Sequence, residues 1–389
     1  MVDDDRRRPF SENYTGTGGY VRNGYLFIIF FIDLSAVVVW LFILTRLDSY
    51  RHDKKSTRLL IKFYFFGLFS VVPAILLYKV SDHISPGLYP GIFEIDSFLF
   101  NFLIAGPIEE VSKFLVFLSI SRRNGTIKDP RDGILQAASV ALGFASVENM
   151  KYGLNFGLEV LVLRSVLTIA GHILYSSIWG FGYSLVRYGN IKRNGAYYNE
   201  LVILSLIPAS FFHGLYNFFL DFGYIRAVIA LNFFILIIFI LIYRFMVTIS
   251  PFKKFPLTDY RTAIYSIRLG LRSHSKSYIL HKRIAFYYLY AGEYKKAYSH
   301  FTSACRLRPL KRVDKFFRGA ALMLSGGTEK GQRLMKAAQV HLNPEKTVLL
   351  KKLLKRILKD KAGFNKILSE LNNILTTSNV RSLREMSSR

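Results

Sequence analysis

The sequence predicts an all-α membrane protein, in which a polytopic transmembrane helix bundle is followed by a cytoplasmic, α-helical, repeat-like C-terminal domain. The first observation is that 51% of the 389 residues are hydrophobic and gather, up to residue 248, in runs of about twenty, the length of a helix that crosses a bilayer. The second is that such runs stop after residue 249. The third is charge, since residues 249–389 hold 30 Lys and Arg against 8 Asp and Glu, within a net charge of +27. These patterns exclude an ordinary soluble enzyme, a disordered chain and a secreted disulfide scaffold, and the single cysteine, Cys305, allows no intrachain disulfide.

The same patterns divide the chain into four segments. Residues 1–24 form an N-terminal segment without the layout of a cleaved signal peptide, so the first apolar run is expected to be an uncleaved anchor. Residues 25–248 are expected to form the transmembrane domain. A basic linker is expected over 249–275, and a helical cytoplasmic domain over 276–389.

Seven spans are expected in the transmembrane domain, or eight if the fifth is two pieces. Their approximate ranges are 25–45, 59–79, 96–120, 134–153, 157–187, 200–221 and 225–247. The fifth is too long for one perpendicular crossing, so it must tilt strongly, kink near Gly171 or be divided. Lys and Arg concentrate in the loops 46–58, 121–133 and 188–199, which places the N-terminus outside and the C-terminal domain in the cytoplasm.

The C-terminal domain carries small and aromatic residues at the spacing of a 34-residue helix-turn-helix unit. They are Ala285, Tyr288, Gly292, Tyr294, Ala297, Phe301, Ala304 and Pro309. The pattern resembles one tetratricopeptide repeat over 278–311, with a degenerate second repeat and a third helical pair at 346–375; a generic helical bundle is the alternative. Such a helical groove suggests a protein partner, and the basic surplus suggests anionic lipid, whereas no motif points to nucleic acid.

Three charged residues lie in the middle of the third span: Glu109, Glu110 and Lys113. Each costs about 3 kcal/mol at the bilayer centre, whereas each Val, Ile, Leu or Phe returns only about 0.5 kcal/mol, so this helix should barely insert alone. Lys113 lies one turn from Glu109 and within reach of Glu110, so it can neutralise one acid. Two adjacent carboxylates in a low dielectric divide into a general base and an acid or orienting group, and the sequence leaves open which is which.

Polar partners are available in three other spans. The fourth carries Glu148 and Asn149, the fifth His172, and the sixth His213 and Asn217. The histidines, Glu148 and the acids of the third span lie 13 to 15 residues from the point where each span enters the membrane, which is roughly 20–23 Å along a helix. Because successive spans enter from opposite faces, equal depths agree only near the middle of the bilayer. We therefore expect one buried polar cluster that faces the interior of the bundle, as functional sites in membranes do.

Four motifs in separate spans carry a resemblance to a known family. They are EExxK in PIEEVSKF (107–114), FxxxEN in FASVEN (144–149), the single His172, and HxxxN in HGLYN (213–217). In this order they resemble PrsW-type intramembrane proteases, a branch of the superfamily that also holds the CAAX prenyl proteases and bacteriocin-processing proteins. Lys113 at this spacing, and Glu148 in place of a histidine, favour the PrsW branch. The resemblance covers residues 25–247 and leaves the tail outside.

The resemblance implies hydrolysis of a peptide bond in a membrane-associated protein by an integral protein of a bacterial inner membrane. The residues implied are Glu109, Glu110, Lys113, Glu148, Asn149, His172, His213 and Asn217. One glutamate of EExxK would deprotonate the attacking water, and the histidine and asparagine of HxxxN would stabilise the oxyanion. His172 would position the water or protonate the leaving amine, and Glu148 would orient it.

Metal-independent hydrolysis is the preferred interpretation, so no cofactor is required. If a metal such as Zn²⁺ were used, Glu148, His172 and His213 would be its ligands, because two imidazoles and a carboxylate make an acceptable zinc site. The sequence has no H-E-x-x-H motif that would decide the question.

Several of these residues also have a structural interpretation. An ion pair with the lysine of EExxK needs only one of the two acids. Glu148 could pair with Lys151, and Arg164 could pair with Glu159 or hold the site. Asp33 in the first span is interpreted as a packing or interfacial residue. For the whole chain, the alternatives are a non-catalytic scaffold that presents the tail and a proton-coupled transporter, for which no inverted repeat is apparent.

Overall fold

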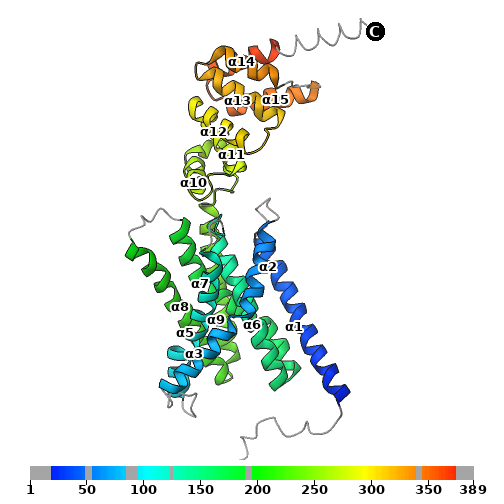
Figure 1. Ribbon diagram of the computed structural model, residues 1–389, viewed down its shortest axis with the longest axis vertical. Helices are drawn as coiled ribbons and strands as arrows, with labels where there is room; N and C mark the ends of the chain where they lie inside the picture. Colours follow the sequence, from blue (N-terminus) through cyan, green and yellow to red (C-terminus); the bar gives the residue numbers. More distant parts are fainter. Residues whose placement is uncertain are drawn as a thin grey trace, which may run out of the picture. The chain divides into compact units, whose positions relative to one another are not determined.

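A computed structural model describes residues 19–48, 55–84, 94–122, 126–188, 195–338 and 344–373. Most of the expected N-terminal segment, 1–24, therefore lies outside the described residues. In these ranges every regular element is a helix and there is no strand. The chain divides into two compact units, Met1–Thr248 and Ile249–Arg389, whose helices are drawn in Figure 1. The protein is an all-α polytopic helical protein, as predicted.

Long and largely apolar helices build the first unit. They are α1 (Gly19–Leu47), α2 (Lys55–Leu68), α3 (Val71–Ile84), α4 (Glu94–Phe100), α5 (Gly106–Ser121), α6 (Asp132–Phe156), α7 (Leu158–Tyr188), α8 (Gly195–Asp221) and α9 (Ile225–Thr248). The predicted second span is divided into α2 and α3 at Phe69 and Ser70, where the backbone forms turn-like hydrogen bonds. The predicted third span is irregular, because α4 continues into α5 through a π-helical segment, η1 (Asn101–Ala105).

Five helical stretches of the described chain are long and apolar enough to cross a membrane. They are Gly24–Leu47, Thr57–Ile84, Leu158–Tyr188, Glu200–Asp221 and Ile225–Thr248. The predicted third span corresponds to α4, η1 and α5, of which α5 carries Glu109, Glu110 and Lys113, and the predicted fourth span corresponds to α6, which contains several polar residues. The number of spans therefore stays a prediction. α7 is one uninterrupted helix, which removes the alternative in which the fifth span is two pieces.

α6 is the most buried helix of the first unit. Its residues 132–146 are all buried, and it packs on α1, α2 and α7. By contrast, α1 and α9 expose large apolar side chains such as Phe31 and Phe233, as helices that face lipid do. A Cβ on Gly143 would lie 2.3 Å from the carbonyl oxygen of Tyr64, so α6 and α2 touch backbone to backbone. The polar residues of α6 are thereby held inside the bundle.

Short amphipathic helices build the second unit. They are η2 (Leu257–Asp259), α10 (Tyr260–Ser273), α11 (Tyr278–Tyr290), α12 (Tyr294–Leu307), α13 (Arg312–Leu324), α14 (Thr328–Ala337), α15 (Pro344–Ile357) and a helix over 361–373. α11 packs against α12, and α13 against α14. The turn within each pair contains a glycine at positive φ, Gly292 at 76° and Gly326 at 108°, which L-residues with a Cβ rarely adopt. Helix pairs thus occur where the repeat pattern predicts them, and the tetratricopeptide assignment itself stays a prediction.

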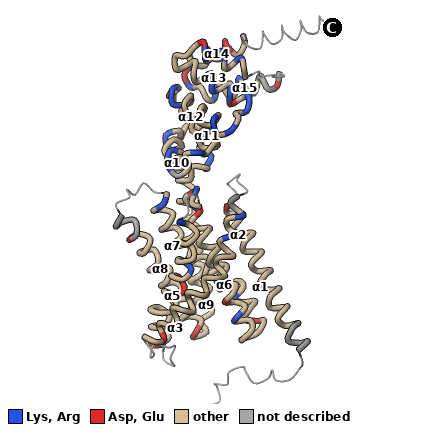
Figure 2. The backbone as a smooth tube through the Cα atoms, in the orientation of Figure 1, with Lys and Arg blue, Asp and Glu red and all other residues tan. Residues whose placement is uncertain are grey.

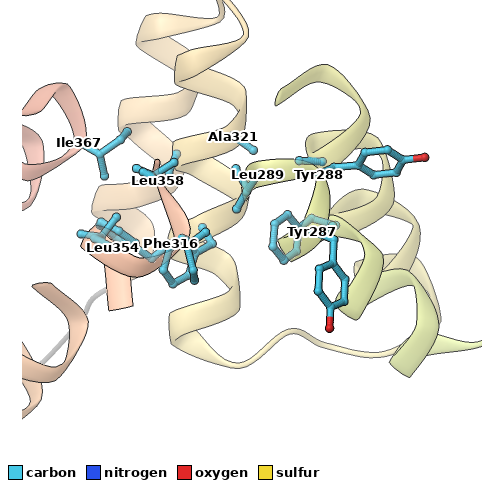
Figure 3. Close-up of a cluster of buried hydrophobic side chains, with 14 of the residues drawn as sticks. Tyr287, Tyr288, Leu289, Phe316, Ala321, Leu354, Leu358 and Ile367 are labelled. Carbon is cyan, nitrogen blue, oxygen red and sulfur yellow. The ribbon is translucent and has the colours of Figure 1, made fainter. Parts of the chain in front are cut away.

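One hydrophobic core joins the helices of the second unit. Figure 3 shows Phe316 between Leu354 on one side and Leu289 on the other, and all three belong to the same buried cluster. Ala263 and Ile267 of α10 are fully buried members of this cluster. The stretch expected to be a linker therefore contributes to the core of the second unit.

Positive charge is spread over the helices of the second unit, as Figure 2 shows. The few acids already have basic partners in places, since Asp314 lies 3.3 Å from Lys282 and Glu329 lies 3.3 Å from Arg333. Because residues 249–389 hold 30 basic and 8 acidic residues, the acids of this segment are too few to pair with most of its cations. The surface of this unit is therefore strongly basic.

Candidate active site

Charged and imidazole side chains from four helices form one buried cluster in the first unit. α5 supplies Glu109, Glu110 and Lys113, α6 supplies Glu148, α7 supplies His172 and α8 supplies His213. Glu110 and Lys113 are completely buried, and His172 and His213 are only 2% and 1% exposed. Hydrogen bonds or ion pairs link each member to at least one other. These side chains therefore meet inside the bundle, where the sequence predicts a cluster.

Close contact between α5 and α8 creates this arrangement. A Cβ added to Gly106 would lie 2.4 Å from a backbone oxygen of α8, and one added to Gly214 would lie 2.6 Å from a backbone oxygen of η1. Only a hydrogen atom fits in either place, so the two segments touch along their backbones. The two acids follow Gly106 by about one turn, and His213 directly precedes Gly214. The glycine contact thereby sets the acids against the imidazole.

Glu110 accepts four hydrogen bonds, two at each carboxylate oxygen. Lys113 Nζ and His213 Nδ1 each lie 2.9 Å from Oε1. Oε2 accepts from Ser176 Oγ at 2.7 Å and from Trp179 Nε1 at 2.8 Å. With a donor for each of its lone pairs, Glu110 is suited to orienting its neighbours rather than to taking a proton.

Glu109 is the less engaged of the two acids. Its Oε1 accepts a hydrogen bond from Tyr78 of α3 at 3.1 Å. Its Oε2 lies 3.4 Å from His213 Nε2 and 3.8 Å from Lys113 Nζ. This oxygen is buried and has no hydrogen bond within the described ranges. An open carboxylate oxygen beside an imidazole is what a general base or a metal ligand requires.

Lys113 is the buried cation at the centre of the cluster. Its Nζ lies 2.9 Å from both Glu110 Oε1 and His172 Nδ1, and 4.3 Å from the centroid of the Phe144 ring. Because an ammonium can only donate, His172 accepts at Nδ1 and carries its proton on Nε2. Lys113 therefore fixes the tautomer of His172.

Glu148 connects the cluster to an arginine of α7. Its Oε2 lies 2.9 Å from His172 Nε2, and its Oε1 lies 3.0 Å from an Nη atom of Arg164. Arg164 Nε also donates to Asn149 Oδ1 at 3.1 Å, and its guanidinium lies 3.8 Å from the centroid of the Tyr152 ring. Arg164 thus holds both polar residues of the FxxxEN motif.

These contacts decide between the structural interpretations of the sequence. Glu148 does not pair with Lys151, which is exposed, because the inner face of α6 turns the carboxylate toward α7. Arg164 does not pair with Glu159, which is also exposed. Arg164 instead pairs with Glu148 of the cluster.

Three ligand atoms in the cluster are placed to hold a metal ion. One oxygen of Glu109 and one ring nitrogen each of His172 and His213 lie within 4.8 Å of one another. The other ring nitrogen of each imidazole is hydrogen-bonded to a carboxylate at 2.9 Å: Glu148 for His172 and Glu110 for His213. Imidazoles oriented in this way by carboxylates are typical of zinc sites, so the donor set fits such a metal. The ligand set expected from sequence needs one correction, because Glu148 lies behind His172 and Glu109 takes its place.

One predicted residue, Asn217, does not reach the cluster. Asn217, predicted as an oxyanion donor, is half-buried and forms no hydrogen bond with the cluster in the part of the chain that the structure describes.

Three residues that contact the acids, Tyr78, Ser176 and Trp179, were not predicted from the sequence. Ser176 and Trp179 had a signal, because they lie four and seven residues after His172 on the same helical face. The sequence held no such signal for Tyr78, because it lies in the apolar run of the predicted second span, which carries none of the four motifs.

Comparisons with known proteins identify the family of the chain. The family model described as PrsW family intramembrane metalloprotease matches residues 55–246, which include every member of the cluster. Protease PrsW of Oceanobacillus iheyensis is 31% identical over 187 residues, 48% of this chain and 81% of that protein. Protease PrsW of Clostridioides difficile is 26% identical over 54% of this chain and 86% of that protein, and Protease PrsW of Bacillus subtilis is 29% identical over 44% and 73%.

No solved structure matches the chain. The family model matches residues within the first unit, and the Oceanobacillus protein is matched over most of its length. On the order and the meeting of the four motifs, and on these similarities, the chain belongs to the PrsW family of intramembrane proteases.

Proposed function

We propose that the protein is an intramembrane endopeptidase that hydrolyses a peptide bond of a membrane-associated protein with water activated by Glu109. The observation that carries this proposal is the contrast between the two acids. Glu109 Oε2 is buried and open beside His213, whereas both oxygens of Glu110 are occupied by donors. The sequence leaves the choice of base open, and the geometry favours Glu109.

The proposed reaction uses the cluster as follows. Glu109 takes a proton from water, whose oxygen bonds to the carbonyl carbon of the scissile peptide. His213 lies beside Glu109 and donates from Nδ1 to Glu110, so it is as the imidazolium, with a second proton on Nε2, that it would donate a hydrogen bond to the oxyanion. The C–N bond then breaks as the leaving amine takes a proton. That proton is the one that Glu109 took from water, which Glu109 returns to the amine. His172 positions the water, with Lys113 donating to its Nδ1 and Glu148 accepting from its Nε2.

The remaining residues act on these groups. Glu110 orients His213 and Lys113, and Glu148 orients His172. Asn217 lies one turn beyond His213 and would have to approach the oxyanion when substrate binds, since catalytic hydrogen bonds often form only in the substrate complex.

Metal-free hydrolysis remains our preferred proposal, although the donor set fits a metal. When bound by Glu109, His172 and His213, a zinc ion would polarise the carbonyl and acidify a water. Lys113 is the reason for the preference, because its ammonium already occupies His172 Nδ1 and would repel a divalent cation. If this is right, 1,10-phenanthroline leaves the rate of cleavage unchanged and the purified protein holds no stoichiometric metal by elemental analysis. A stoichiometric metal whose removal abolishes cleavage would reverse the preference.

Substitution of the two acids tests the main proposal. Glu109→Gln keeps the Tyr78 contact but cannot take a proton, so cleavage of co-expressed single-span reporter proteins should fall by about 10²–10⁴-fold with normal membrane insertion. Glu110→Gln should also lower cleavage, and in addition lower thermal stability, because a charged partner of Lys113 is lost. Wild-type cleavage by Glu109→Gln would remove Glu109 as the base.

We also propose a role and a place for the second unit. Its helix pairs are taken as tetratricopeptide-like repeats that recruit a protein partner on the cytoplasmic side of a bacterial inner membrane, and the first unit as a member of the CAAX prenyl protease superfamily. Deletion of 276–389 should then abolish capture of the partner but leave cleavage of reporters that do not depend on it. A purely scaffolding protein would instead tolerate both glutamate substitutions and lose its function with the tail.

A further inference from the structure

A second set of buried polar residues connects α1 to the active site. Asp33 of α1 is only 3% exposed, although its neighbours Phe30, Phe31 and Leu34 face outward. Ser146 Oγ of α6, itself 4% exposed, donates to Asp33 Oδ2. Burying a carboxylate within an apolar membrane helix costs free energy, so we expect Asp33 to have a function.

Asn149 lies between Asp33 and the active site. It is completely buried, and it follows Ser146, the donor to Asp33, by three residues on the same side of α6. Neither Asn149 Nδ2 nor Asp33 Oδ1 meets the geometry of a direct hydrogen bond, and both are otherwise unsatisfied within the described residues. A buried donor and a buried acceptor in the same contact between α1 and α6 can satisfy one another directly or through a water.

The chemistry of its two neighbours decides which way the Asn149 amide points. Arg164 can only donate, and its Nε lies 3.1 Å from Asn149 Oδ1. Asp33 can only accept. An amide between them therefore turns its oxygen to Arg164 and its NH₂ to Asp33. The same guanidinium lies 3.0 Å from Glu148, which in turn holds His172 at 2.9 Å.

We propose that Asp33 is a positioning residue of the site, acting through Asn149 and Arg164 on Glu148 and His172. This replaces the interpretation of Asp33 as a packing or interfacial residue. The inference rests on the proposed hydrolase function for its kinetic test. α1 lies outside residues 55–246, the part of the chain that the family model matches, so it adds a residue from an additional helix to the site.

The kinetic test compares Asp33→Leu with Asp33→Asn in the full chain, reconstituted in liposomes. The probe is a peptide of one reporter span with a fluorophore and a quencher on opposite sides of the cleavage position. Leucine preserves volume and removes both acceptor oxygens, whereas asparagine retains one. We expect Asp33→Leu to unfold at or above the wild-type temperature but to lose about tenfold in kcat with KM unchanged. Asp33→Asn should recover most of the loss.

Ser35→Leu is the matched control. Ser35 lies on α1, is not buried, and bonds only to the carbonyl of Phe31 on its own helix. It should leave kcat unchanged. A double-mutant cycle with Asn149→Ala then tests whether Asp33 acts through Asn149. In the Asn149→Ala background, Asp33→Leu should lower kcat little further. Additive losses, or wild-type kcat in Asp33→Leu, would overturn the proposal. If Asp33→Leu fails to insert, the cycle is run with Asp33→Asn.

A second readout does not depend on proteolysis. The ¹⁵N resonances of His172, assigned by their loss in His172→Gln, should move in Asp33→Leu at one fixed pH and stay in place in Ser35→Leu. If the wild type cleaves no probe but this movement is seen, the hydrolase proposal fails and the positioning role of Asp33 stands. An unmoved His172 in Asp33→Leu overturns the positioning role whatever the activity.

Discussion

Two adjacent carboxylates receive different surroundings because successive residues of a helix point about 100° apart. Glu110 turns toward α7, where Ser176 and Trp179 donate to it. Glu109 turns toward α3, where Tyr78 is its only hydrogen-bond donor in the described ranges. Both remain in reach of Lys113 and His213. One acid therefore holds the site together and the other keeps an open oxygen.

The two tryptophans of the chain offer a residue-scale test. Trp179→Phe removes the N–H that donates to Glu110 but keeps an aromatic ring against Phe114 and Phe117. One lost hydrogen bond to a charged group is worth about 1.5–3 kcal/mol, so cleavage should fall at least about tenfold. Trp40→Phe is the control, because Trp40 donates to a backbone carbonyl, that of Ser165, outside the cluster. Equal activity in the two variants would show that the Trp179 bond does not support the site.

The buried ion pair offers a second test at this scale. Lys113→Met leaves Glu110 buried without its cation, which should destabilise the protein by about 3–5 kcal/mol. Adding Glu110→Gln removes the unpaired charge, so the double variant should unfold at a higher temperature than Lys113→Met alone. Differential scanning calorimetry in liposomes measures both. A double variant that is less stable than Lys113→Met would contradict the argument.

At the scale of elements, two features bring the helices of the site together. η1 interrupts the regular helix just before α5, and π-helical turns of this kind are frequent at functional sites. Glycines then allow η1 and α5 to touch α8. α6 is buried along residues 132–146 and presents Glu148 and Asn149 to α7 rather than to lipid. Helix contact, more than loop structure, therefore positions the reactive groups.

Gly214→Ala tests the contact between η1 and α8. The added Cβ would lie 2.6 Å from a backbone oxygen of η1, which cannot rotate away, so the helices must separate. We expect a loss of about 1–3 kcal/mol in stability and at least about a tenfold loss of cleavage, because Glu109 moves away from His213. Gly24→Ala is the control, since nothing lies within 4 Å of its Cβ position. An active and stable Gly214→Ala protein would mean that the contact is not needed.

At the scale of the whole molecule, the two units differ in chemistry. The first has apolar outer helices around a polar interior, and the second has a hydrophobic core and a basic surface. In the second unit, His281 and His300 lie with their Nδ1 atoms 2.9 Å apart between α11 and α12. Burial, the neighbouring His281 and then Arg268 lower the pKa of His300 from 6.5 to about 4.

This shifted pKa predicts how the stability of the second unit depends on pH. Because folding lowers the proton affinity of His300, the unfolded chain binds a proton more readily, and stability falls as pH drops from about 6.5 toward 4. His300→Gln lacks this titration. Calorimetry of the full chain should therefore show a larger decrease in unfolding temperature between pH 7 and pH 5 for the wild type than for His300→Gln. Equal decreases would mean that His300 is not the cause.

The sequence by itself determined the helical class, the apolar helices and the polar groups that had to meet. Runs of apolar residues have only one stable form in lipid, and charges within them need partners, so Glu109, Glu148, His172 and His213 are identifiable without coordinates. The order of the motifs also determined the family.

Only the tertiary structure decided which acid is open, which donors surround it and which carboxylate faces the imidazoles. These properties depend on the rotation of each helix and on contacts between helices distant in sequence, such as Tyr78 with Glu109, Trp179 with Glu110 and Asp33 with Ser146. Spacing along a chain gives the depth of a residue within its own helix, but the angle at which that helix meets its neighbours follows from packing against all of them.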